Sequence, residues 1–161
     1  MSKPFLIAFA TAVAAIGVLV WVGLEKTAGN HLVPTGSIGK VRTIQTGDDT
    51  TFMVVDFNVT NDSDRDMVVR SVESTVDAAD GSTITGGTVA AADVATVFQA
   101  YPILGEQYNQ VLKERDTIPP RHTVDRMVGI RLDAPLAKVD GRKRVRLRIE
   151  DITGPVLELT K

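Results

Sequence analysis

An uncharged apolar run near the N-terminus constrains this chain more than any other feature. The twenty residues from Phe5 to Leu24 contain no charged side chain and no proline. At the rise of an α-helix they span roughly 30 Å, the thickness of the hydrocarbon core of a bilayer. The run therefore predicts a single transmembrane helix that ties the rest of the chain to a membrane.

A cleaved signal peptide is the alternative interpretation of this run. Lys3 makes a positive start, and the small residues at 12–14 would suit a signal peptidase. The apolar run continues for ten residues past Ala14, however, which favours a retained anchor. The small charge bias around the run predicts a cytoplasmic N-terminus and a periplasmic domain, anchored in the inner membrane, with Trp21 near the outer interface.

Small residues spaced about one helical turn apart in this run allow close packing against other membrane helices. They lie on the two flanks of the predicted helix, Ala8, Ala12 and Ala15 on one and Ala10, Ala14 and Gly17 on the other. Alanine as a neutral apolar filler explains the same pattern, so both interpretations stay open.

The rest of the sequence has the size of one domain. A linker is predicted over 27–39, followed by a domain over 40–161 that is long enough for a single hydrophobic core. The net charge of -2 gives no electrostatic basis for nucleic-acid binding. The chain has no cysteine, so the domain uses neither disulfides nor thiolate metal ligands.

Strands dominate the predicted domain. The strongest signal is at 51–60, where apolar residues alternate with Asp56 and Asn58 in the period of a half-buried strand. A polar turn over 61–66 separates it from a second strand at 67–76, which either forms a hairpin with the first or crosses to a second sheet. Further features follow in chain order, a turn at Asp80 and Gly81 and then strands at 122–132, 144–151 and 156–159.

Two short amphipathic helices are predicted as an insertion at about 90–115. Apolar residues fall at helical spacing in both segments, at Val94, Val97, Phe98 and Tyr101 and then at Leu104, Tyr108, Val111 and Leu112. The insertion either caps an open end of the sheets or forms a docking surface for a partner. The docking interpretation uses Val94, Phe98, Tyr101 and Tyr108.

Three segments of the domain resemble a known fold family. The segments at 54–63, 118–124 and 146–151 look like parts of the immunoglobulin-like β-sandwiches of bacterial membrane-anchored or lipid-linked surface domains. They are more distantly similar to the water-stress late-embryogenesis-abundant domains. The resemblance implies a mainly β fold, with a transmembrane helix followed by an immunoglobulin-like antiparallel β-sandwich that the short helical insertion interrupts. It transfers no site residue.

A row of arginines is the second candidate docking surface. Side chains alternate along a strand, so one face of the segment at 142–149 carries Arg142, Arg144, Arg146 and Arg148. Such a row could pair with carboxylates of a partner or with anionic lipid headgroups. The alternative is an ordinary solvent-facing strand whose charges prevent edge pairing.

Metal binding and catalysis have little support. The carboxylates at 62, 64, 66 and 73 copy the spacing of a calcium loop, but Met67 stands where that loop needs glycine. The two histidines, His31 and His122, are far apart in the sequence, and the chain has neither a nucleophile elbow nor a glycine-rich phosphate loop. We therefore expect no catalytic residue, no metal site and no cofactor.

These features predict a non-catalytic, single-pass accessory or structural subunit of a larger membrane complex, such as a photosynthetic or respiratory one. Its partners would be the bilayer and other membrane protein subunits. The alternative function is a membrane-tethered binding module that holds a lipid or a small apolar ligand between the sheets or under the helices.

Overall fold

The computed structural model describes residues 13–22 and 33–161. Residues 13–22 are helical, and residues 33–161 form a separate unit with its own core. Among the described residues, no helix combines the length and the apolar character needed to cross a bilayer. The predicted span over 5–24 extends past both ends of helix 13–22 into residues that are not described.

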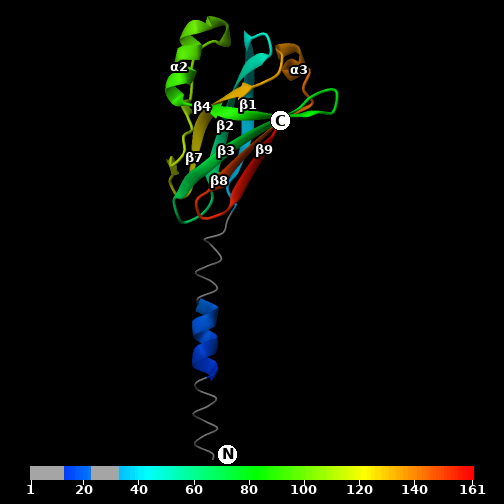
Figure 1. Ribbon diagram of the computed structural model, residues 1–161. Coiled ribbons are helices and arrows are strands. Elements are labelled where there is room, and N and C mark those ends of the chain that lie inside the picture. The colour runs from blue at the N-terminus through cyan, green and yellow to red at the C-terminus, as the bar shows by residue number, and fades with distance from the viewer. Residues whose placement is uncertain (1–12, 23–32) are drawn as a thin grey trace, which may run out of the picture. The chain divides into compact units, whose positions relative to one another are not determined.

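The unit over 33–161 is mainly β, and its strands curl into a largely antiparallel, sandwich-like structure (Figure 1). Neighbouring strands follow the order β1-β2-β7-β4-β3-β8-β9, while β5 pairs with β7 and β6 with β3. The strands are β1 (Thr35–Gly47), β2 (Thr50–Asn61), β3 (Met67–Asp77), β4 (Thr83–Val89), β5 (Gln110–Val111), β6 (Thr117–Ile118), β7 (His122–Leu132), β8 (Arg144–Asp151) and β9 (Val156–Thr160). The helices are α2 (Ala91–Ala100), the 3₁₀ helix η2 (Pro102–Leu104) and α3 (Leu136–Asp140).

The five strands predicted from the sequence are confirmed as β2, β3, β7, β8 and β9. Two long strands were not predicted, β1 and β4. β1 begins at Thr35, inside the segment predicted as linker, because residues 35–38 pair with residues 57–60 of β2. β4 follows the predicted turn at Asp80 and Gly81, which is confirmed.

β2 and β3 do not form a hairpin, because the chain crosses between the two halves of the curled sheet after β2. β2 lies between β1 and β7, whereas β3 pairs with β8, β4 and β6. Hydrogen bonds of the Asn61 side chain hold the crossing segment in place. Its Nδ2 donates to the carbonyl oxygens of Arg65 at 2.7 Å and Ile118 at 2.9 Å, and its Oδ1 accepts the hydroxyl of Ser63 at 2.7 Å. The side chain of Asn61 is therefore buried and fully bonded.

β4 joins the two halves of the curled sheet. Residues 83–86 pair with β3, and residues 87–89 pair with β7. Gly86 stands at the change of partner, where a Cβ would collide with the side chains of Ile130 and Leu132. β4 thus leaves β3 after Gly86, and a stretch of the β3 edge stays uncovered.

The turn before β4 is tied to α3. The amide and the hydroxyl of Ser82 donate to Oδ1 of Asp80 at 2.9 Å and 2.6 Å, and Lys138 Nζ lies 3.1 Å from Oδ2. These contacts, those of Ser82 first, hold the pKa of the Asp80 carboxyl well below its usual range.

Two hydrophobic clusters lie on opposite faces of β2. The main core fills the space between the sheets and includes Met53, Val55 and Phe57 of β2. The second cluster contains Phe52 and Val54 of β2, Met127 of β7, and three residues of the segment 90–111, which are Val94, Leu104 and Val111. β2 is therefore buried on both faces from Thr51 to Phe57. The prediction of a half-buried strand is wrong there, because the segment 90–111 covers the second face.

Of the two helices predicted in the insertion, only the first is present. α2 confirms the first helix. The second helix is wrong, because η2 ends after one turn at Gly105, whose φ is 78°, and Gln110 and Val111 pair with β7 as a short parallel strand. α2 approaches β7 closely at Gly129, where a Cβ would collide with Val94 and Phe52. Glycine at this position lets the helix pack on the sheet.

Candidate functional site

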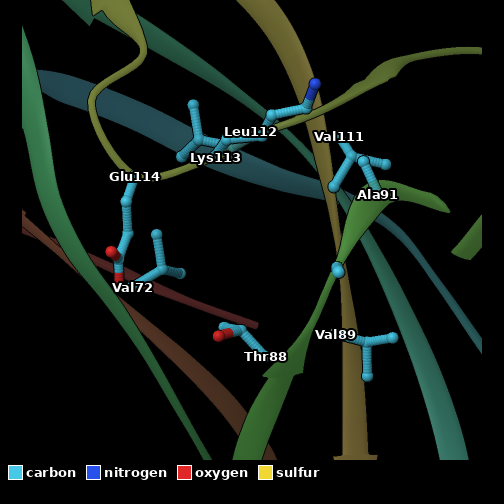
Figure 2. Close-up of a pocket in the computed structure, with 9 residues that line it drawn as sticks. Val72, Thr88, Val89, Ala91, Val111, Leu112, Lys113 and Glu114 are labelled. Carbon is cyan, nitrogen blue, oxygen red and sulfur yellow. The ribbon is translucent and has the colours of Figure 1, made fainter. Parts of the chain in front are cut away.

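A groove of about 430 Å³ lies where β4 leaves β3. Figure 2 shows its lining, with Val72 and Glu114 on one side, Ala91 and Val111 on the opposite side, and Thr88 below. Val89, Ala90, Leu112 and Lys113 complete the wall. Most of these side chains are apolar, and the charged ones, Lys113 and Glu114, are exposed at the rim.

The backbone of β3 adds polar groups to one wall of this groove. β4 pairs with β3 only from Ser74 onward, and β6 pairs only with Met67 and Val68. Ala78 donates its N–H to Ser82 on the β4 side, so the alternation along the strand turns the peptide groups of Val72 to the same edge. The groove therefore combines an apolar body with a donor and an acceptor of the main chain and the hydroxyl of Thr88.

A buried ion pair lies under the segment 101–109. Arg42 on β1 donates from Nη2 to Oδ2 of Asp56 on β2 at 2.8 Å, and the two side chains are 6% and 10% exposed. Nη1 of Arg42 donates to the carbonyl oxygens of Leu104 at 2.9 Å and Glu106 at 2.8 Å. Asn109 Nδ2 donates to the other carboxylate oxygen of Asp56 at 2.9 Å. One arginine thus ties two strands to the segment that covers them.

Aromatic rings enclose the same guanidinium. The Cζ atom of Arg42 lies 5.0 Å from the ring centre of Phe98 and 5.9 Å from that of Tyr108. Both distances suit a cation–π contact. Both Nη atoms of Arg42 and both carboxylate oxygens of Asp56 are bonded within the fold, while Nε of Arg42 is buried without a hydrogen-bond partner among the described residues. This network positions the segment 101–109.

The predicted docking residues of the insertion differ in how far they are exposed. Val94 is fully buried in the second cluster, so its predicted role in docking is wrong. Phe98 and Tyr101 are half-buried against the same cluster. Tyr108 is 69% exposed, and Ile103, which was not singled out from the sequence, is 83% exposed. The exposed apolar surface of the insertion therefore centres on Ile103 and Tyr108.

The arginine row divides into paired and unpaired members. Arg148 lies 3.1 Å from Glu73, and Arg146 lies 3.5 Å from Asp77 and 3.2 Å from Glu158. Arg142 precedes β8 and contacts Asp140 at 3.7 Å. Within residues 33–161, no ion pair engages Arg144. The row is thus a largely neutralised strand face at Arg146 and Arg148, and a cationic cluster only near Arg142 and Arg144.

The remaining candidate residues are placed as follows. Ala14, Ala15 and Gly17 belong to the exposed helix 13–22, whereas Ala8, Ala10, Ala12 and His31 lie outside the described residues. His122 Nδ1 lies 2.7 Å from the carbonyl oxygen of Pro120.

The carboxylates with the calcium-loop spacing each have a different partner. Asp62 accepts the hydroxyl of Thr35, Asp64 pairs with Arg121, and Glu73 pairs with Arg148. In the described ranges, no group of three or more potential metal ligands converges.

Sequence reasoning missed Arg42 and the groove. A signal for Arg42 existed, since Asp56 shares its strand face with Phe52 and Val54, and an acid among apolar residues indicates a buried partner. The groove had no such signal, because its residues come from three distant segments, 72, 88–91 and 111–114.

Comparisons with known proteins give only distant similarities. No protein-family model and no curated protein matches the sequence. A protein of Bacillus subtilis subsp. subtilis str. 168 described as a candidate lipoprotein, ycdA, is similar in structure at 14% identity and a TM-score of 0.47, covering 80% of this chain. This chain spans only 36% of the length of that protein.

Two further solved structures show the same low level of similarity. An uncharacterised β-sandwich protein of Clostridium difficile 630 has 11% identity and a TM-score of 0.39, with 80% of this chain and 85% of that chain covered. An ApaG protein of Pseudomonas aeruginosa PAO1 has 13% identity and a TM-score of 0.36, with 71% and 90% covered. No late-embryogenesis-abundant domain is among these three. At such TM-scores they say nothing about what this chain binds.

Proposed function

We propose that the chain is a non-catalytic, membrane-tethered binding module that holds a small ligand with an apolar body and one polar group. The observation that carries the proposal is the groove beside β4. Its volume of about 430 Å³ lies within the range of small-molecule sites, which is roughly 300–1,000 Å³. Apolar walls with a few convergent polar groups are also typical of such sites.

The ligand class follows from the lining of the groove. Val89, Val111 and Leu112 would bury an acyl or other apolar chain, while the main chain of Val72 and the hydroxyl of Thr88 would orient a polar group. Lys113 at the rim, beside Glu114, would pair with an anionic group such as a carboxylate. A medium-chain fatty acid has this chemistry and serves as a probe.

The test uses the full chain in phospholipid nanodiscs with labelled valine and leucine methyl groups. Adding dodecanoate should shift the NMR signals of Val72, Val89, Val111 and Leu112 and leave those of Val59 unchanged, because Val59 lies in the main core and does not line this groove. If the groove methyl groups do not respond, the proposal fails.

Two matched variants locate the binding. Ala90, which precedes α2, is exposed and lines the groove, whereas Ala92 in the first turn of α2 is exposed and does not line it. Ala90→Phe should fill the groove and abolish the shifts, and Ala92→Phe should preserve them. Equal behaviour of the two variants would contradict binding in the groove.

An accessory subunit of a membrane complex is the second candidate function. Its support is the exposed apolar surface at Ile103 and Tyr108, together with the exposed apolar residues of helix 13–22, which include Ile16, Leu19 and Trp21. On this proposal the apolar run over 5–24 spans the inner membrane, and the domain with an immunoglobulin-like arrangement lies in the periplasm.

Gentle detergent extraction followed by size separation and mass spectrometry tests the subunit proposal. We expect the chain to migrate with stoichiometric partners, and Ile103→Ser to release it from them while Ile152→Ser, another exposed apolar position, does not. Migration as a lone monomer would contradict it.

A further inference from the structure

A second groove, about 290 Å³ in volume, is lined by the segment from the end of α3 to the start of β8, by Val41 of β1 and by Lys161, which follows β9. We call it the basic groove. Its lining consists of Val41, Asp140, Arg142, Lys143, Arg144, Val145 and Lys161. Four of these seven residues are cationic, and one is acidic. The basic groove is separate from the groove beside β4, with which it shares no residue.

The positive charge of the basic groove is not balanced within the fold. Asp140 is the one acidic side chain in its lining, and Oδ1 of Asp140 also accepts the hydroxyl of Thr43 at 2.6 Å. Within residues 33–161, no ion pair engages Lys143, Arg144 or Lys161. A concave surface with one sign of charge concentrates the electrostatic potential and attracts counter-ions.

Two of the four cations are held in position. Arg142 is half-buried, and its Nη1 donates to the carbonyl oxygen of Val139 at 3.1 Å. Nζ of Lys161 donates to the carbonyl oxygen of Gly39 on β1. Val145, which is 1% exposed, contributes apolar surface to the groove. Lys143 and Arg144 are exposed, so their side chains can approach an anion without displacing a partner.

We infer that the basic groove binds a phosphate group. A guanidinium offers planar, paired N–H donors that match phosphate oxygens, and an ammonium adds a compact point charge. Arg142 and Arg144 supply the first kind of donor, and Lys143 and Lys161 the second. The phosphate belongs either to a small water-soluble phosphate compound or to the headgroup of a phospholipid.

The experiment is isothermal titration calorimetry on the full chain in a non-ionic detergent, with inorganic pyrophosphate and, separately, with glycerophosphoglycerol, the soluble headgroup of phosphatidylglycerol. If glycerophosphoglycerol binds, with or without pyrophosphate, the groove is assigned to a lipid headgroup. Pyrophosphate alone assigns it to a water-soluble phosphate. No heat with either probe up to about 10 mM, a concentration well above a millimolar dissociation constant, overturns the inference.

Variants with equal loss of charge separate the groove from general electrostatics. Lys143→Gln with Arg144→Gln should weaken binding about tenfold or more, since it removes two donors from the groove. Arg146→Gln with Arg148→Gln removes two charges from paired positions on the same strand, and we expect less than about a threefold change. Equal weakening by the two double variants overturns the inference. Lys143→Arg with Arg144→Lys keeps the charge and should keep most of the affinity, and thermal unfolding confirms that each variant is folded.

Discussion

The two outer faces of the curled sheet carry the same kind of ion pair in opposite surroundings. On β1 and β2, Arg42 and Asp56 lie under the segment 101–109 and are nearly inaccessible. On β3 and β8, Glu73 and Arg148 are 60% and 44% exposed. Water screens the exposed pair Glu73–Arg148 and not the buried pair Arg42–Asp56. The buried pair therefore decides where a segment of the chain lies, and the exposed pair only neutralises charge.

The covered face also differs in what surrounds the pair. Phe52, Val54 and Met127 form an apolar floor, on which α2 packs through Val94. The opposite outer face, on β3, β8 and β9, has the alternating burial of a half-exposed sheet. The comparison teaches that a covered sheet face in this fold depends on both apolar packing and one buried charge pair that is hydrogen-bonded to the covering segment.

Removing the acid of the buried pair should have the largest effect. Asp56→Ala leaves Arg42 buried without its counter-ion and should lower the free energy of unfolding by about 3–5 kcal/mol. Urea unfolding of the full chain in a non-ionic detergent measures this change.

The double replacement Arg42→Met with Asp56→Leu is the control for that measurement. It removes both charges, so it should destabilise the protein clearly less than Asp56→Ala alone. If Asp56→Ala lowers the free energy of unfolding by less than about 1 kcal/mol, the distinction between the two faces does not hold.

Forcing α2 away from the sheet should have an intermediate effect. Gly129→Ala places a Cβ against Val94 and Phe52, and such overpacking should lower the free energy of unfolding by about 1–3 kcal/mol. The amides of α2 should also exchange faster with solvent. Gly87→Ala is the matched control, because a Cβ at Gly87 meets no atom within 4 Å. Equal unfolding free energies of the two variants would mean that the close approach at Gly129 is unimportant.

Breaking an exposed pair should have the smallest effect. Glu73→Gln removes the partner of Arg148, and we expect a change of at most about 1 kcal/mol that becomes smaller as salt is added. A double-mutant cycle with Arg148→Gln measures the coupling between the two side chains. A coupling above about 2 kcal/mol, or one that salt leaves unchanged, would show that this face behaves like the covered one.

Local pattern was enough to find most of the strands. The alternation in β2, β3, β7 and β8 and the turn residues between them are properties of short segments, which is why these elements could be predicted. β4 was missed because Gly86 and Gly87 interrupt it, and Gly86 serves the close approach to β7. The prediction of a second helix was wrong for a related reason. Leu104 and Val111 are apolar because they are buried in the second cluster, and the segment that carries them is irregular.

Long-range placement could not be read from the sequence. The charge of Arg146 and Arg148 is visible in the sequence, but their neutralisation depends on Glu73, Asp77 and Glu158, which the pairing of β3, β8 and β9 brings alongside. Both grooves have the same origin. One exists because β4 changes partners, and the other because residue 161 follows β9 to a position beside Val41 and the turn before β8.

The sequence by itself determined a mainly β domain and an apolar run long enough for a membrane span, since both depend on the periodicity and length of local segments. Only the tertiary structure decided that Arg42 is buried, that Val94 belongs to a core, and which cations remain unpaired. The physical reason is that burial and pairing depend on contacts between residues far apart in the chain, and side-chain chemistry alone does not specify which residues meet.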